Sequence, residues 1–151
     1  MKLSTRGDYA TRALLELSLL EGRALSVHEL SERTRISPKY LEQIMMRLRA
    51  ANLVRSTRGA HGGYELAKSA QEVTVGEVIR VMDGPLAPSP CASQSAHVPC
   101  PRYRCPTEES CVLRGLWLDV RDAISSVLDG TTFAELVHRQ RNAPRRDGYS
   151  I

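Results

Sequence analysis

The fold of this chain is decided by residues 26–66, which read SVHELSERTRISPKYLEQIMMRLRAANLVRSTRGAHGGYEL. A first helix is expected to open at Ser26, because Glu29 stands three residues later and completes a capping box. A second helix is expected to open at Ser37, a good N-cap residue, with Pro38 at the first helical position. Two short strand-like runs follow. Helix, turn, helix and hairpin in this order are the layout of a winged helix-turn-helix that reads DNA.

The second helix of this segment has two chemically different sides. Apolar residues recur at helical spacing and form one face, namely Leu41, Ile44, Met45 and Leu48. Charged and polar residues occupy the other side and its borders, namely Lys39, Tyr40, Glu42, Gln43, Arg47 and Arg49. Such a helix can bury one face on its partner helix and offer donors and acceptors to base edges in the major groove.

The two strand-like runs, residues 53–57 and 64–66, enclose a glycine-rich turn. Its glycines, Gly59 among them, allow positive φ angles and a close approach of the backbone to a phosphate. Arg58 stands where it can enter a narrow minor groove. A solvated helix and an ordinary hairpin would explain each piece alone. Their order and their shared positive charge together favour binding to double-stranded DNA.

Composition and charge narrow the class of protein. The chain has 151 residues, 42% of them hydrophobic and 25% charged, which is normal for a globular protein. Residues 1–80 carry 13 Lys and Arg against 9 Asp and Glu, whereas residues 81–151 carry 8 of each. The excess positive charge therefore lies in the half with the expected DNA reader. The absence of a signal-peptide pattern and of a long apolar run predicts a cytoplasmic protein with no membrane partner.

The chain divides into four segments by pattern. Residues 1–83 form the expected DNA-binding domain, which also holds a helix rich in leucine and alanine near its start and a capping box at Thr74 and Glu77. Residues 84–110 hold six of the eight prolines and three of the four cysteines, which is typical of a functional loop. Residues 111–141 are expected to be helical, and residues 142–151 a loosely ordered tail.

The apolar stripe that begins after Cys111 runs for nearly five helical turns and includes the only tryptophan. It is too long for so small a domain to cover, so we interpret it as a dimerisation helix, although it could instead fold back on its own domain. A short helix capped by Thr132 follows it. The expected fold class is mainly α with a small β-hairpin wing: a winged helix-turn-helix plus a long C-terminal dimerisation helix.

The four cysteines lie in the pattern Cys91-x8-Cys100-x4-Cys105-x5-Cys111. These gaps are wider than those of common zinc ribbons. In a cytoplasmic protein, four cysteines so close together indicate a metal or redox site rather than a set of structural disulfides. Cys111 stands where the long helix begins, and the helix dipole there stabilises a thiolate. An iron-sulfur cluster, zinc, a thiol redox switch and unliganded cysteines all remain open from this chemistry.

The sequence resembles the winged-helix bacterial regulators that include IscR, NsrR and CymR. The resemblance rests on YLEQ with RGxxGGY, on GEVIRVMDGPLAP and on LWLDVRDAISSVLDGTTFAEL, and it covers nearly the whole chain. It implies a homodimeric transcription regulator that acts as a repressor. It further implies DNA contacts from Ser37, Lys39, Tyr40 and Gln43 in the major groove and from Arg58 in the minor groove. Arg47 and Gly59 complete the set of DNA-binding residues that we expect.

The same resemblance implies that Cys100, Cys105 and Cys111 hold an iron-sulfur cluster of two or four irons, which senses iron-sulfur, redox or nitric oxide status. Arg114 stands where IscR has its fourth ligand, a histidine, and cannot coordinate. The fourth ligand would therefore be Cys91 or, as in NsrR-like proteins, Asp8 of the other subunit.

Two other functions compete with a cluster sensor. The segments GEVIRVMDGPLAP and WLDVRDAISSVLDGTT look closer to CymR. They imply a cluster-free regulator of cysteine metabolism that is controlled by thiol oxidation or by a partner enzyme of cysteine synthesis, with structural zinc as a lesser alternative. An enzyme with Cys111 as nucleophile is disfavoured, because no general base can be identified.

Overall fold

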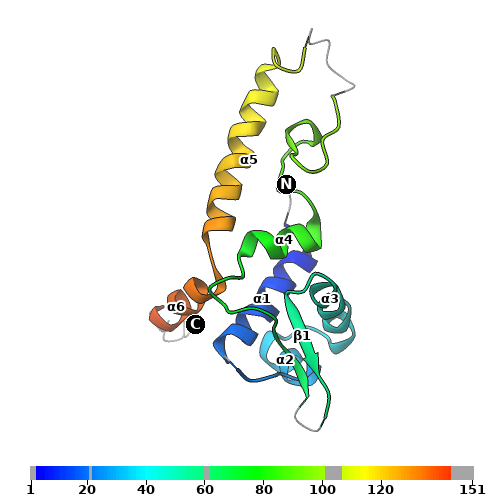
Figure 1. Cartoon of the computed structure of the whole chain (residues 1–151), viewed down its shortest axis with the longest axis vertical. Coiled ribbons are helices and arrows are strands. Elements are labelled where there is room, and N and C mark those ends of the chain that lie inside the picture. Colours follow the sequence, from blue (N-terminus) through cyan, green and yellow to red (C-terminus); the bar gives the residue numbers. More distant parts are fainter. Residues whose placement is uncertain (1–2, 21, 60–61, 101–106, 144–151) are drawn as a thin grey trace, which may run out of the picture.

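The computed structural model describes residues 3–20, 22–59, 62–100 and 107–143. Helices and a two-stranded hairpin form the body, and one long helix extends away from it (Figure 1). The elements in chain order are α1 (Thr5–Leu19), α2 (Val27–Thr34), α3 (Pro38–Ala50), β1 (Val54–Thr57), β2 (Gly63–Leu66), α4 (Val75–Asp83), η1 (Pro90–Ala92), α5 (Val112–Gly130) and α6 (Phe133–Asn142). The expected fold class is confirmed.

The core forms around α1, which packs against α2, α3, α4 and α6. Leu14 of α1, Leu30 of α2 and Leu48 of α3 are fully buried together. Phe133, at the start of α6, is buried in the same cluster. The C-terminal helix thus returns to the body, so residues from both ends of the chain stabilise the platform that carries α3.

Side-chain caps fix where the helices of the body begin. Ser26 Oγ accepts the N–H of Glu29 (3.2 Å) and Glu29 Oε2 accepts the N–H of Ser26 (2.9 Å), so the predicted capping box is confirmed. The backbone N–H and the hydroxyl of Ser26 both donate to Glu29 Oε2, and these two bonds hold the pKa of Glu29 below its usual value. The same reciprocal pair opens α4.

Ser37 stands at the N-cap of α3, as predicted, but its hydroxyl makes no capping bond. Its carbonyl instead accepts the N–H groups of Tyr40 (3.1 Å) and Leu41 (3.0 Å), and Pro38 has no N–H to satisfy. The exposed hydroxyl of Ser37 is therefore not needed to start the helix.

The wing is an antiparallel pair of strands in which Val54 lies opposite Leu66. Leu25 and Tyr64 exchange two backbone hydrogen bonds of 2.7 and 2.8 Å, which joins β2 to the segment just before α2. The wing is thereby held against the helix-turn-helix.

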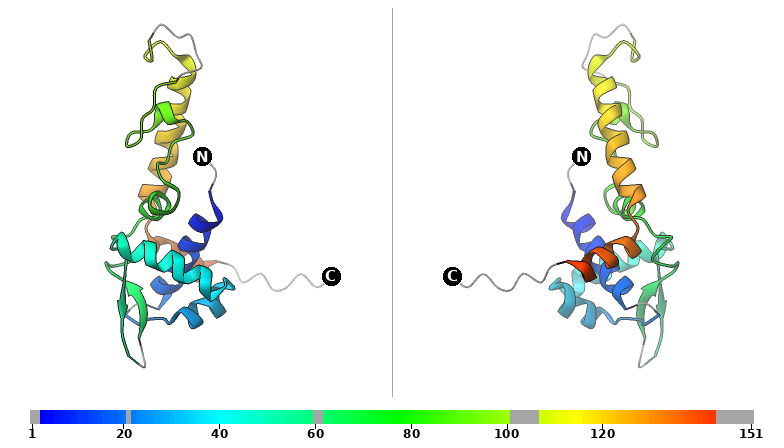
Figure 2. Two further views of the ribbon diagram at one scale, coloured as in Figure 1. Left: turned by 90° about the vertical axis from the view of Figure 1, so that its right-hand side faces the viewer. Right: turned by 90° about the vertical axis from the view of Figure 1, so that its left-hand side faces the viewer.

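The segment from Gly84 to Cys100, predicted to be a functional loop, contains one short 3₁₀ turn, η1. This segment lies alongside α5 in all three views (Figures 1 and 2). Arg114 Nε donates to the carbonyl of Cys91 (3.2 Å), and Arg121 Nη1 donates to that of Ala92 (2.9 Å). The loop therefore covers one side of α5, while α4 of the body contacts the helix near its end.

None of the helices in the described ranges is long and apolar enough to cross a membrane.

Candidate DNA-binding face and cysteine loop

The two sides of α3 differ in burial as their chemistry predicts. The side facing the core is buried and consists of Leu41, Ile44, Met45 and Leu48. The opposite side is exposed and carries Lys39, Glu42, Gln43, Met46, Arg47 and Arg49. The predicted amphipathic helix is confirmed, and its exposed side is free to approach a second molecule.

Tyr40 differs from the other expected contact residues because it is half-buried. Its ring meets that of Tyr9 on α1 edge to face, with centroids 5.7 Å apart and an interplanar angle of 84°. Such pairs add to the free energy of burial. Tyr40 therefore helps to set the position of α3 on α1, whatever its hydroxyl contacts.

Arg58 follows β1 directly and is exposed, so the wing presents a cation near its tip. Gly59 has φ +117°, a conformation that favours glycine, and its carbonyl accepts the N–H of Gly62 (2.9 Å). The turn that the glycines predicted is therefore present. Residues 60–61 lie outside the described ranges.

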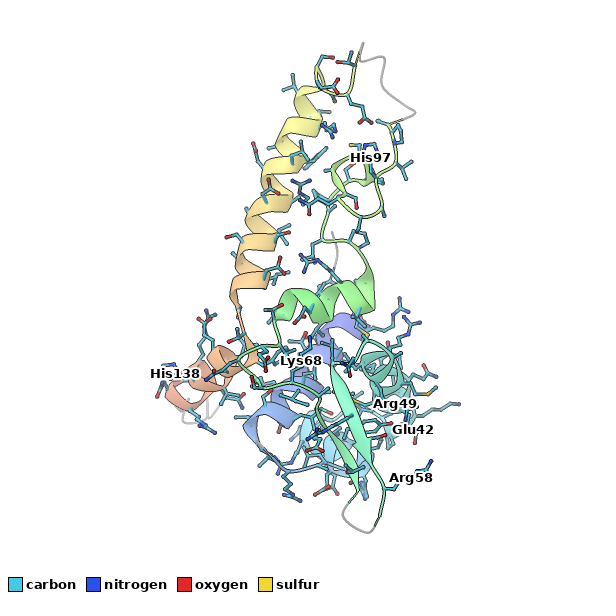
Figure 3. The ribbon with its side chains drawn as sticks, in the orientation of Figure 1. Glu42, Arg49, Arg58, Lys68, His97 and His138 are labelled. Carbon is cyan, nitrogen blue, oxygen red and sulfur yellow. The ribbon has the colours of Figure 1, made fainter. Side chains whose placement is uncertain are left out.

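The exposed side of α3 and the wing lie next to each other. Arg49 Nη1 on α3 donates to Ser56 Oγ on β1 (3.3 Å). In Figure 3, Glu42 and Arg49 of α3 and Arg58 of the wing lie along the same side of the molecule.

The charge on this face is positive and largely unpaired. In the part of the chain that the structure describes, Lys39, Arg47 and Arg58 form no ion pair. Unpaired cations on an exposed helix and wing can neutralise phosphates while polar side chains reach base edges. The face therefore has the chemistry of a DNA-binding surface.

Three cysteines line one cavity between the loop and the start of α5. The cavity has a volume of about 370 Å³, and its walls include Cys91, Cys100 and Cys111 with the apolar side chains of Leu113 and Trp117. Cys91 is 8% exposed, and its Sγ lies 3.3 Å from Ser89 Oγ. Cys111 is the N-cap residue of α5, as predicted. Cys105 lies outside the described ranges.

A carboxylate that the sequence did not single out also lines this cavity. Glu108 Oε2 lies 3.0 Å from His97 Nε2 and 3.7 Å from Arg114 Nε. Its other oxygen, Oε1, is buried and has no hydrogen-bond partner among the described residues. His97, in the same loop, is thus held by Glu108. The only sequence signal for this contact was the position of Glu108, a carboxylate between Cys105 and Cys111 in a polar loop.

The described cysteines share a cavity but do not form a completed metal site. Among the described residues, no three His, Cys, Asp or Glu side chains converge closely enough to hold a metal ion. Asp8 lies elsewhere in the protomer, in an open pocket with Ser4 and Tyr9, and its Oδ2 is 3.0 Å from Arg12 Nε.

The helix-turn-helix, its wing and the unpaired cations define a winged-helix DNA-binding regulator of transcription. The chain belongs to the Rrf2 family, whose model, described as an iron-dependent transcriptional regulator, matches residues 3–139. It is therefore a transcription regulator and not an enzyme.

Two kinds of relative are about equally similar to this chain. The regulator CymR of Bacillus subtilis is 36% identical over 137 residues, which cover 90% of this chain and 89% of CymR. The regulator IscR of Escherichia coli O139:H28 is 36% identical over 141 residues, which cover 93% of this chain and 82% of IscR.

The solved structures of these two regulators are also about equally similar to this chain. The structure of CymR, the global cysteine regulator of B. subtilis, matches with a TM-score of 0.75 and 35% identity, covering 91% of this chain and 97% of that one. The structure of T. potens IscR matches with a TM-score of 0.75 and 33% identity, covering 99% and 95%. Overall similarity therefore fixes the family but does not choose between these two regulators.

Proposed function

We propose that this chain is a cytoplasmic, homodimeric repressor that binds a twofold operator through α3 and the wing. Lys39, Gln43 and Arg47 would lie in the major groove, together with the hydroxyls of Ser37 and Tyr40. Arg58 would enter the minor groove beside Gly59. The observation that carries this proposal is the exposed, unpaired positive charge on the outer side of α3 and on the adjoining wing.

The exposed apolar stripe of α5 supports the homodimer. This helix has 19 residues and none of them is buried. Val112 is 86% exposed and Val127 is 65% exposed, on the side of α5 away from the loop. At 1.5 Å per residue the helix is about 28 Å long. Pairing two such stripes would remove them from water and place two reader helices on successive half-sites.

We further propose that the cysteine loop holds an iron-sulfur cluster through Cys91, Cys100, Cys105 and Cys111. The donor types fit, because cysteine thiolates are the usual ligands of these clusters. Three of the four thiols already line one cavity, whose walls also include the apolar side chains of Leu113 and Trp117. A cluster would supply a centre that responds to iron supply, oxygen and nitric oxide. Arg114 and Arg121 tie the loop to α5, so a change in the loop can reach the helix that pairs the subunits.

A cluster-free regulator is the second candidate, and the similarity to CymR favours it. In that case Cys111, at the N-terminus of α5, would be the reactive thiol, and a partner enzyme of cysteine synthesis could bind the dimer. A cluster-free regulator could also bind structural zinc through the same thiols. Asp8 of the other subunit would then have no ligand role.

The deciding experiment is an ultraviolet-visible spectrum with iron, sulfide and zinc analysis of protein purified without oxygen. Visible charge-transfer absorption with matched iron and sulfide is expected. Cys91→Ser and Asp8→Asn are then compared as matched single variants, and only Cys91→Ser should reduce cluster occupancy or stability. Colourless protein that takes up no cluster on anaerobic reconstitution would refute the cluster. Zinc in stoichiometric amount, or peroxide-dependent loss of DNA affinity in colourless protein, would support the second candidate.

A further inference from the structure

Met46 is an apolar side chain in an unexpected place. It lies on α3 and is 61% exposed, although the residue before it, Met45, is fully buried in the core. Most of its side chain is therefore open to solvent. On the outward side of α3 it is available to a partner outside the chain.

The position of Met46 on the helix identifies the surface to which it belongs. Lys39, Gln43, Met46 and Ala50 follow each other at intervals of four, three and four residues, so they form one stripe along α3. This stripe is opposite the buried residues of the helix and all four members are exposed. Met46 therefore lies on the line along which α3 faces outward.

The stripe is long enough to reach several base pairs. Met46 lies seven residues beyond Lys39, a rise of about 10 Å along α3, and that distance spans roughly three base-pair steps. A helix that places Lys39 and Gln43 in the major groove thus brings Met46 over base edges a short way further along. Its neighbours Glu42 and Arg47 flank it with polar groups.

The chemistry of the major groove leaves one group for Met46 to contact. Base edges there present hydrogen-bond donors and acceptors, with the C5-methyl group of thymine as the apolar exception. A thioether is a poor hydrogen-bond partner, but it is flexible and polarizable and packs well against a methyl group. We propose that Met46 determines sequence specificity by contacting the C5-methyl group of a thymine in each operator half-site.

This inference rests on the proposed DNA contacts of α3, so the experiment must separate the two. Duplexes are first selected from a random library with the full-length wild-type chain, held without oxygen. Each thymine of the selected site is then replaced by uracil, which removes only the methyl group, and the Kd is measured at one fixed salt concentration. One thymine in each half-site should show a loss of about two- to fivefold in affinity when its methyl is removed.

Three variants make the test specific. Met46→Ala should bind the selected site more weakly and lose the response to uracil at that thymine, whereas Met46→Leu, which keeps an apolar side chain, should retain it. Both should melt with the wild-type chain, because the side chain is exposed. Arg58→Ala is the control for DNA contact as such: it should weaken binding to every duplex and leave the uracil profile unchanged.

An unchanged uracil profile in Met46→Ala would overturn the inference and leave the DNA-binding proposal intact. That result would also be expected if Met46 served a protein partner and not a base. Failure of the wild-type chain to select any sequence would refute the DNA contacts themselves, and Met46 as a base reader with them.

Discussion

At the residue scale, one ion pair fixes the base of the long helix to the body. Arg80 of α4 binds both carboxylate oxygens of Asp129 near the end of α5, at 2.6 and 2.7 Å. The hydrogen bonds from Arg80 hold the pKa of Asp129 below its usual value, and the same contact raises the pKa of Arg80. Both side chains are 42% exposed, so solvent screens the pair.

Asp129→Asn should therefore lower the free energy of unfolding only modestly, by about 0.5–1 kcal/mol at pH 7. Because the folded pKa of Asp129 is depressed, its contribution is fully present above the unfolded pKa of about 3.9 and is lost as the pH falls through the folded pKa. Urea denaturation of the wild-type chain and of Asp129→Asn at several pH values measures this contribution. Asp122→Asn, which removes a carboxylate from a neighbouring pair, is the control. If the two proteins differ in unfolding free energy as much in acid as at pH 7, the ion pair is not the cause of the difference.

Gly76 is the residue that lets this pair form. A Cβ atom at Gly76 would lie 1.9 Å from Asp129 Oδ1 and 2.9 Å from Arg80 Nη1. Gly76→Ala should thus destabilise the wild-type chain by displacing the carboxylate. In an Asp129→Ala background the closest obstruction is absent, and the flexible end of Arg80, released from its ion pair, can move aside. The same change should then stabilise by roughly 0.5–1 kcal/mol, since alanine is the better helix former. Urea denaturation of the wild-type chain, the two single variants and the double variant measures these effects. An equal loss of unfolding free energy from Gly76→Ala in both backgrounds would exclude the steric explanation.

At the element scale, α3 and the wing should make separable contributions to DNA binding. Arg58→Ala should weaken binding and reduce the salt slope by about one, because a cation close to the phosphates that border the minor groove is lost. Gln43→Ala should instead cost about 1–3 kcal/mol on the preferred sequence and relax specificity at one base pair. Fluorescence anisotropy titrations over a range of salt concentrations distinguish the two.

A matched loss of charge away from this face provides the control. Arg139 is exposed on α6 and paired with Glu135, and α6 lies on the other side of the body from α3 (Figure 1). Arg139→Ala should leave both the affinity and the salt slope close to those of the wild-type chain. An equal effect of Arg139→Ala and Arg58→Ala would mean that net charge, and not the wing, governs binding.

The elements could be predicted where local pattern decides structure. The capping boxes and the apolar spacing of α3 act within a few residues, so their positions follow from the sequence. The contacts of the loop could not be predicted, because His97 and Glu108 belong to segments without periodicity that meet only through the position of α5. The half-burial of Tyr40 against Tyr9 likewise depends on how α1 and α3 pack.

At the scale of the whole molecule, the exposed stripe of α5 requires a second subunit in the proposed function. One side of the helix is occupied by the loop through Arg114 and Arg121, which leaves the stripe of Val112, Leu116 and Val127 outward. Exposed apolar area of this extent on a small protein marks an interaction surface.

A charge placed within this stripe should therefore separate the subunits and, with them, the two reader helices. Leu116→Glu with Val127→Glu should shift the sedimentation coefficient from dimer to monomer. Ser126→Glu, on the exposed polar side of the same helix, should not. In the proposed function each α3 binds one half-site, so the monomer should keep weak binding to a half-site duplex and lose the additional affinity of the full operator. A double variant that sediments as a dimer, or a monomer that binds the full operator as tightly as the wild-type chain, would show that α5 does not pair the readers.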